Sequence, residues 1–317
     1  MMKKLNEIRI GFFGTPDFSL NFLRDLFDND VKVQFVVSQP PRNSGRGKPL
    51  KSSPVHEWAK RNNIKVFTPT NVNDKKFMEK ILDNKIDLNI VVAYGKILNE
   101  KLINLPRSLS INVHASLLPR WRGAAPIQRA ILSNDKKTGV CIMKVDKKLD
   151  AGPVISEHEI KINESDNFKS VHDKIIRHGK ILLRKAIINI ANNDIKLKYQ
   201  NDKFASYARK IDKSELKIQW NNDAKEINSK IRAFSPKPGA WTKFKNSDAR
   251  IKILEASVVE NLNTDCRKLN IGQITNDFKV RCAKDFLEIK ILQKEGKRPI
   301  SATDFLNGNK VQDLSFS

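Results

Sequence analysis

The chain has 317 residues and a mass of 36.2 kDa; 39% of the residues are hydrophobic and 30% are charged. This length predicts two domains, because one domain usually takes about 100–200 residues. The apolar content suffices for a core and argues against disorder over the whole length. The formal net charge of +24 favours a polyanionic partner, with nucleic acid ahead of a membrane surface.

Lysine supplies most of this charge, with 42 Lys against 17 Arg. Such a bias can also be a habit of the whole genome, so the charge alone does not identify a partner. Residues 1–200 contain 36 basic and 20 acidic side chains, and residues 201–317 contain 23 and 15. Both parts are therefore basic, and the charge is not confined to one tail.

The three cysteines, Cys141, Cys266 and Cys282, are widely spaced and form no Cys-x-x-Cys pair. A disulfide framework and a structural zinc site are therefore unexpected, which fits a reducing compartment. The first apolar stretch is too short and too charged for a signal peptide. No uncharged apolar run approaches the roughly 18 residues of a membrane helix, so we expect a soluble, cytoplasmic protein.

The first part of the chain alternates short apolar strands with amphipathic helices. Residues 8–13 predict a buried strand, and apolar residues at helical spacing predict a helix over 18–27. The expected elements that follow are a strand over 31–37, a helix over 54–61, a strand over 65–67, a helix over 75–82 and a strand over 88–93. This alternation predicts a mostly parallel sheet covered by helices, with ligands at the carboxyl ends of its strands.

The pattern changes after residue 162. A long helix is predicted over Val171–Ile190, a polar linker over Lys196–Ala208 and a helix over Ala224–Ala233. Short strand-like runs follow, at 240–244, 251–256, 271–274, 279–282 and 287–292. Several short strands separated by turns predict a small β-barrel or sandwich.

Nucleotide-binding motifs are missing from the sequence. The turn after the first strand reads Gly-Phe-Phe-Gly-Thr-Pro over residues 11–16, which is not the Gly-x-Gly-x-x-Gly fingerprint. The P-loop pattern is also missing from the sequence. Both a nicotinamide dehydrogenase and a P-loop enzyme are therefore disfavoured.

The strongest group of polar residues lies on the strand predicted over Leu109–His114. Side chains alternate along a strand, so Asn112 and His114 share one face at its carboxyl end. An amide donor beside an imidazole suits the stabilisation of an oxyanion and the transfer of a proton. The alternative is a histidine bonded to a backbone carbonyl in a purely structural role. The other four histidines are predicted to lie on the surface: His56, His158, His172 and His178.

Two further loops carry candidate residues. In the loop over residues 145–153, either Asp146 or Asp150 could orient the imidazole, and the spacing does not decide between them. Residues 39–51 form a loop rich in cations, glycine and proline, which is either a solvated loop or a basic arm that reaches phosphates. The run Arg120-Trp121-Arg122 could stack a base or simply pack.

In combination, these motifs resemble the folate-dependent formyltransferase family. The central pattern is Asn-x-His-x-Ser-Leu-Leu-Pro-x-x-Arg-Gly, followed by Leu-Asp-x-Gly. The resemblance runs from about residue 8 to the C-terminus and is carried by residues 14–19, 45–50, 91–98, 111–128, 138–155 and 231–241. Within the family, the match is to the branch that acts on methionyl-initiator tRNA.

The resemblance implies a Rossmann-like catalytic domain over residues 1–192, a linker over 193–206, and an OB-like β-barrel over 207–317 that contacts tRNA. It also implies 10-formyltetrahydrofolate as co-substrate and no metal. The implied catalytic residues are Asn112, His114 and Asp150. The implied folate contacts are Tyr94, Gly95, Ser116, Leu117, Leu118 and Pro119, and the implied tRNA contacts are Arg42, Arg46 and Lys48. The chain departs from the family pattern at Pro41 and Lys237, where Asp and an aromatic residue are usual.

Three alternatives remain at this point. A glycinamide-ribonucleotide formyltransferase would share the catalytic residues but would need no second basic domain. A sugar-nucleotide N-formyltransferase would not need a cationic loop beside the site. A non-catalytic RNA-binding protein would explain the charge and leave the three polar residues without a role.

Overall fold

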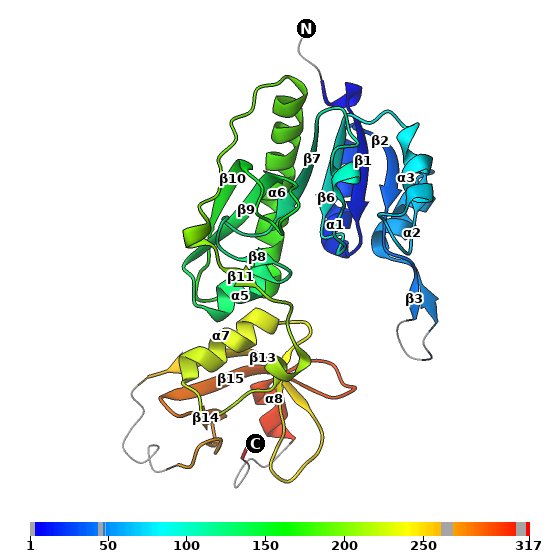
Figure 1. Cartoon of the computed structure of the whole chain (residues 1–317). Helices are drawn as coiled ribbons and strands as arrows, with labels where there is room; N and C mark the ends of the chain where they lie inside the picture. The colour runs from blue at the N-terminus through cyan, green and yellow to red at the C-terminus, as the bar shows by residue number, and fades with distance from the viewer. Residues whose placement is uncertain (1–3, 44–46, 48, 261–268, 309–314) are drawn as a thin grey trace. The chain divides into compact units, whose positions relative to one another are not determined.

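The computed structural model describes residues 4–43, 47, 49–260, 269–308 and 315–317. The chain divides into two compact units (Figure 1). The first comprises Met1–Pro126, Thr138–Ile160 and Asp173–Ala208, and the second comprises Ile127–Lys137, Lys161–His172 and Arg209–Ser317.

A seven-stranded sheet forms the centre of the first unit, in the order β10-β9-β7-β6-β1-β2-β5. Its strands are β1 (Arg9–Gly14), β2 (Lys32–Val37), β5 (Val66–Phe67), β6 (Leu88–Val92), β7 (Leu109–His114), β9 (Lys137–Lys144) and β10 (Val154–Lys161). The five strands from β7 to β5 are parallel, as the sequence predicts, whereas β9 is antiparallel to β7. The sheet is therefore mixed, and β7 is an interior strand at the change of direction.

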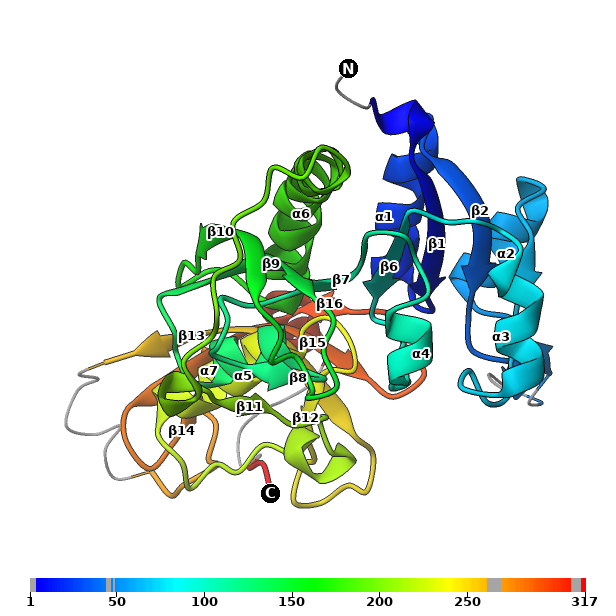
Figure 2. The same cartoon turned by 45° about the horizontal axis from the view of Figure 1, so that its top comes forward.

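Helices lie on both sides of this sheet (Figures 1 and 2). They are α1 (Asp17–Asp28), α2 (Pro54–Arg61), α3 (Lys75–Leu82), α4 (Glu100–Ile103) and most of α6 (Phe168–Ala191). Helix α5 (Pro126–Leu132) belongs to the second unit from Ile127 onward. Helix α1 contacts β1, β2 and β6. Phe13 of β1 and Phe35 of β2 are fully buried in a cluster with apolar residues of α3 and α4. Gly11 lies on the same face, where a Cβ atom would come within 2.5 Å of the Phe35 ring.

The second unit contains a five-stranded antiparallel sheet in the order β12-β13-β15-β14, with β16 also paired to β15. Its strands are β12 (Ala240–Thr242), β13 (Ile251–Val259), β14 (Lys279–Arg281), β15 (Phe286–Lys294) and β16 (Ile300–Ser301), and its helices include α7 (Ala224–Phe234) and α8 (Ala302–Asn307). Helix α7 packs on β13. Phe316 stacks on Trp220 and on Phe244, with ring centroids 5.2 and 4.8 Å away, so the end of the chain closes this core.

The predicted fold class, an α/β domain followed by a smaller β domain, is confirmed. The predicted helices over 54–61 and 75–82 and the strand over 109–114 agree residue for residue with α2, α3 and β7. The strand expected over residues 271–274 is wrong. These residues form a turn with two isolated bridges, because Gln273 pairs with Ser315 and Ile274 with Val280. Among the described residues, no helix combines the length and the apolar character needed to cross a membrane.

Two short strand pairs connect loops of the first unit. Strands β3 (Arg42–Asn43) and β4 (Leu50–Lys51) form an antiparallel hairpin. Strands β8 (Arg122–Gly123) and β11 (Tyr207–Ala208) pair in parallel and lie side by side in both cartoon views. The segment expected to be a polar linker therefore pairs with the chain that follows β7.

Candidate active site

Strand β7 brings Asn112 and His114 to one carboxylate at its C-terminal end. The Asn112 amide donates to Oδ1 of Asp150 at 3.4 Å, and His114 Nδ1 lies 3.6 Å from Oδ2 of the same side chain. The backbone N–H of Gly123 also donates to Oδ2, at 2.8 Å. The imidazole is 5% exposed, so this group of polar atoms lies largely out of water. The structure thus assembles the three residues that the sequence resemblance selects.

Both ring nitrogens of His114 face oxygen atoms that can only accept hydrogen bonds. Nε2 lies 2.9 Å from the carbonyl oxygen of Trp121, while Nδ1 faces the Asp150 carboxylate. A neutral imidazole carries a proton on one nitrogen only and would satisfy one of these contacts. The contact at Nε2 is within hydrogen-bond distance, whereas the 3.6 Å between Nδ1 and Oδ2 is longer than a hydrogen bond.

The structure distinguishes the two candidate aspartates. Asp146 is exposed, and its carboxylate accepts the N–H of Lys148 within its own turn. Asp150 has a left-handed backbone conformation, with φ of 48°, which turns its side chain toward β7. The spacing of residues could not decide between them, because a single unusual backbone angle decides which carboxylate meets the imidazole.

Hydrogen bonds from Gln200 and the buried Arg122 hold the backbone of the Asp150 loop. The Gln200 amide donates to the carbonyl oxygens of Asp150 and Gly152 at 2.9 and 2.7 Å. Arg122, whose side chain is 2% exposed, donates from Nε to Gln200 at 3.0 Å and from a terminal nitrogen to Asp202 at 2.8 Å. The Arg122 guanidinium therefore binds Gln200 and Asp202 of the protein itself. Sequence analysis missed Gln200, because it lies in a segment without periodicity, 50 positions after its partner.

The predicted folate segment continues from His114 into a tight turn. Ser116 is buried, and its hydroxyl donates to the carbonyl of Arg120 at 2.6 Å. Leu118 packs in a buried cluster with Cys141 and Met143 of β9. Leu117 lies over Gly139, where a Cβ atom would come within 2.5 Å of its side chain. Pro119 is half-buried and follows Leu118 through a cis peptide bond. The segment is therefore fixed against β9.

Tyr94 and Gly95 form a second turn, after β6. The Tyr94 carbonyl accepts hydrogen bonds from Gln39 and Thr15 at 2.8 and 3.1 Å. Its ring is buried beside Phe13, and its hydroxyl is buried without a hydrogen-bond partner among the described residues. Burial raises the pKa of this hydroxyl to about 12, so it stays a neutral donor. Gly95 has φ of 80°, a conformation that favours glycine.

Arg42 lies exposed on the β3–β4 hairpin, and its guanidinium donates to the side chain of Gln39. Gln39 in turn donates to the Tyr94 carbonyl, so the base of the basic hairpin is tied to the predicted folate turn. The other two predicted tRNA contacts, Arg46 and Lys48, lie outside the residues that the structure describes.

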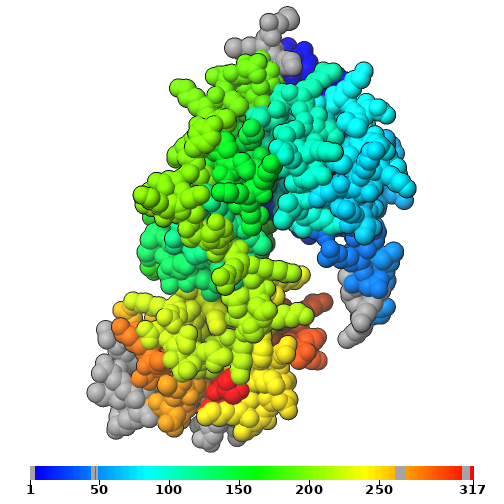
Figure 3. All heavy atoms as spheres, in the orientation of Figure 1, coloured from blue at the N-terminus to red at the C-terminus, as the bar shows by residue number. Residues whose placement is uncertain are grey.

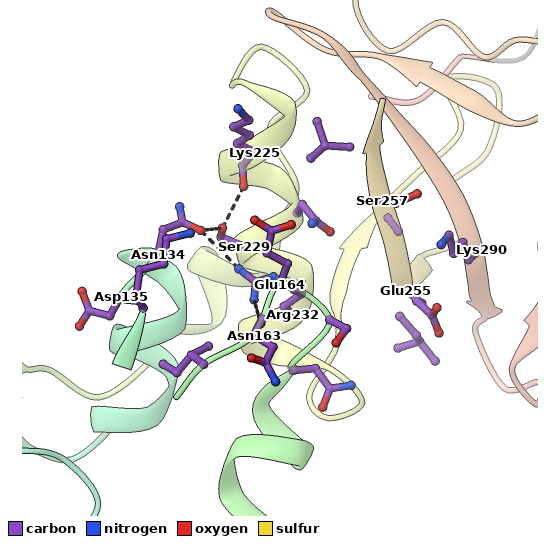
Figure 4. A pocket seen from close by; sticks show the side chains of 18 of the residues that line it. Asn134, Asp135, Asn163, Glu164, Lys225, Ser229, Arg232, Glu255, Ser257 and Lys290 are labelled. Atoms are coloured by element: carbon purple, nitrogen blue, oxygen red, sulfur yellow. Dashed lines mark hydrogen bonds between the residues drawn. The ribbon is translucent and has the colours of Figure 1, made fainter. Parts of the chain in front are cut away.

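A cavity of about 790 Å³ lies in the second unit, beside α7 (Figure 4). Arg232 crosses it to the carbonyl of Asp166 at 3.0 Å and to the side chain of Asn134 at 3.3 Å. No predicted site residue lines this cavity. Nor do three His, Cys, Asp or Glu side chains converge as a metal site would require, within the part of the chain that the structure describes.

The fold is that of a formyl transferase. The formyl transferase family model matches residues 8–187, and the model of the formyl transferase C-terminal domain matches residues 210–310. The chain is 42% identical over 307 residues to the methionyl-tRNA formyltransferase of Sulfurihydrogenibium sp., covering 96% of this chain and 98% of the relative. It is 41% identical to that of Rhizobium etli, covering 96% and 97%. The chain belongs to the methionyl-tRNA formyltransferase family.

Solved structures share the fold at lower sequence identity. The N-formyltransferase from Helicobacter canadensis, in complex with folinic acid and dTDP-3-aminofucose, superposes with a TM-score of 0.66 at 21% identity and covers 90% of this chain and 99% of that chain. HypX from Aquifex aeolicus in complex with tetrahydrofolic acid has a TM-score of 0.63 at 15% identity, over 94% of this chain and 47% of that one.

Proposed function

We propose that the chain transfers the formyl group of 10-formyltetrahydrofolate to the α-amino group of methionyl-initiator tRNA. The observation that carries this proposal is the convergence of Asn112, His114 and Asp150 at the end of β7. Family membership supplies the reaction, and the net charge of +24 suits a tRNA substrate. The place of this reaction is the cytoplasm, where initiator tRNA is used.

The first chemical step is the attack of the methionine amine on the formyl carbon, which turns the formyl oxygen into an oxyanion. Asn112 donates a neutral hydrogen bond to this oxygen, and the His114 imidazolium donates a charged one. Nε2–H of His114 faces the Trp121 carbonyl in the structure. The oxyanion takes this donor, because a charged acceptor binds an imidazolium N–H more strongly than a neutral carbonyl does.

The second step breaks the bond between the formyl carbon and N10 of the folate. The attacking amine loses a proton and N10 gains one, so the overall reaction releases no proton. Asp150 orients the imidazole and carries the proton between the two nitrogens through water. Its Oδ2 atom remains anchored by the Gly123 N–H throughout.

The substrates need sites on either side of this carboxylate. The turn at Tyr94–Gly95 and the segment over residues 116–119 bind the folate. Arg42, Arg46 and Lys48 contact phosphates of the tRNA acceptor stem. The hydrogen bonds of Gln39 to Tyr94 and Arg42 support this assignment, because they join the two binding regions.

One assay separates the candidate functions. The purified full chain is incubated with 10-formyltetrahydrofolate and, in parallel, with methionyl-initiator tRNA, methionyl-elongator tRNA and an amino-sugar nucleotide. We expect formylation of the initiator tRNA in preference to the other two. Formylation of the sugar nucleotide alone would replace the proposal with the sugar-modifying function. Binding of tRNA without any formyl transfer would favour the non-catalytic alternative.

A further inference from the structure

The segment over residues 199–208 exposes three aromatic side chains beside the catalytic loop. Tyr199, Phe204 and Tyr207 are 79%, 72% and 60% exposed. Single exposed apolar residues are ordinary on protein surfaces and need no explanation. Three within nine residues, all from one segment, are a local concentration that the packing of the first unit does not account for.

Other residues of the same segment face inward. Gln200 donates to the Asp150 and Gly152 carbonyls, and Ala208 is buried and pairs with Gly123. The Ser206 hydroxyl accepts the N–H of Trp121 at 3.0 Å, and its carbonyl accepts the N–H of Arg122 at 2.8 Å. The segment is thus held against the catalytic region by its inward residues, while its aromatic rings remain in solvent.

The pairing of β8 with β11 determines how far these rings lie from the residues that hold Asp150. Tyr207 is the register partner of Arg122, whose neighbour Gly123 donates to the Asp150 carboxylate. Paired strands lie about 4.8 Å apart, so the Tyr207 backbone is close to the residues that hold Asp150. Phe204 lies three residues earlier and therefore at most about 11 Å further along the chain.

Cations lie near the rings. Lys203 is exposed between Tyr199 and Phe204, next to Asp202, whose carboxylate is paired with Arg122. Lys196 and Lys198 are exposed just before the segment, and Lys198 is paired with Glu157 at 2.9 Å. Aromatic side chains near cations are typical of surfaces that bind single-stranded nucleic acid, where the bases stack on the rings and the phosphates meet the charges. In the space-filling view, yellow-green atoms of this part of the chain lie on the visible face (Figure 3).

We propose that Tyr199, Phe204 and Tyr207 form a stacking surface for the unpaired nucleotides at the 3′ end of the aminoacylated tRNA. This inference rests on the proposed function. The methionine is esterified to the last nucleotide of that end, so its amine reaches Asp150 only when the neighbouring bases lie beside the catalytic loop. The surface positions these bases without reading their sequence, because every base has a face that can stack.

The test replaces all three rings with alanine and measures steady-state formylation of methionyl-initiator tRNA. We expect the KM for tRNA to rise about 5-fold or more for each ring that carries a base, with the KM for folate unchanged. Tyr199→Phe, Phe204→Tyr and Tyr207→Phe keep the rings and should retain the wild-type KM. Leu82→Ala, which removes an exposed apolar side chain from α3, is the matched control.

Equilibrium binding identifies the part of the RNA that is involved. Uncharged tRNA without its unpaired 3′ nucleotides should bind the triple variant and the wild type equally, whereas intact tRNA should bind the variant more weakly. An unchanged KM for tRNA in the triple variant would overturn the inference, as would an equal loss of affinity for the shortened tRNA. If the wild type itself formylates no tRNA, the proposed function fails first, so the two failures are distinguishable.

Discussion

Asn112 and His114 approach the same carboxylate from the same face of β7, yet only the imidazole can bring a positive charge to the reaction. In the proposed mechanism, Asn112 contributes geometry and a neutral donor, while His114 contributes charge as well. A reaction that develops negative charge on oxygen should depend on both, because each donor is fixed before the charge appears.

We predict the effect on turnover of removing either the Asn112 or the His114 donor. Asn112→Ala and His114→Ala should each lower kcat for tRNA formylation by at least ~10²–10³, the usual cost of one oxyanion donor. Steady-state kinetics with both substrates varied would measure this. Asn21→Ala, which removes an amide on α1 bonded to the Asp17 carbonyl, should leave kcat near the wild-type value. Near-normal turnover in both site variants would refute the assigned roles.

Some of these site residues could be predicted from local sequence patterns, and others could not. Strand alternation alone placed Asn112 and His114 on one face, because that periodicity is a local property. Asp150 needed the family resemblance, since its orientation depends on a left-handed backbone angle that no spacing reveals. The contacts of the Trp121 carbonyl and the Gly123 N–H were not predicted, because residues of nearly every type carry the same backbone groups.

At the scale of elements, the Asp150 loop is supported from its far side by a segment that shows no strand or helix pattern. Gln200 spans two carbonyls of that loop, and buried Arg122 fixes the amide of Gln200 in turn. Gly152 allows the loop to lie close to β9, since a Cβ atom there would be 2.0 Å from the Lys144 carbonyl. These contacts support the loop that carries the carboxylate, in addition to the Gly123 N–H that bonds the carboxylate directly.

Gln200→Leu removes this support and keeps nearly the same side-chain volume. We expect kcat to fall about 10-fold to 100-fold, because a displacement of the order of 1 Å in a catalytic group can cost that much. The KM for folate should remain unchanged, so the split between kcat and KM separates a positioning role from general damage. Gln293→Leu, which also removes an amide bonded to a backbone carbonyl, is the control in the second unit. A wild-type kcat in Gln200→Leu would contradict this role.

Elements with strong local patterns were predicted well. Helices α2 and α3 begin with clear boundary residues, and in strand β7 apolar residues alternate with polar ones, so their limits agree with expectation. Helix α4 has only four residues, too few for periodicity to register. The contacts of residues 198–208 with β8 and the Asp150 loop join segments far apart in the sequence, which single-sequence patterns do not detect.

For the whole molecule, the net charge of +24 predicts that the affinity for tRNA depends strongly on the salt concentration. Both parts of the chain are basic, and Arg42 is bonded to Gln39, which is bonded to the predicted folate turn. Under the proposed function, much of the excess charge attracts tRNA generally, and Arg42 and Arg46 contact its phosphates. Replacing both arginines with alanine should weaken tRNA binding and reduce the slope of log affinity against log salt by about 2.

The measurement is tRNA affinity at several salt concentrations, together with the affinity for folate at one. Arg61→Ala, an exposed arginine at the end of α2, should change the slope little and serves as the control. An equal loss of folate affinity in the double variant would show that the loop has a structural role instead.

The contacts of residues 198–208 with the Asp150 loop and β8 also determine where the chain can be cut without disturbing the catalytic part. A fragment that ended at residue 192, where helix and linker were expected to meet, would lack Gln200, Ser206 and Ala208. Its Asp150 loop would keep the Gly123 contact but lose the amide behind it, and β8 would lose its partner strand. Truncation, circular permutation or fusion of the catalytic part should therefore keep the chain intact through Ala208.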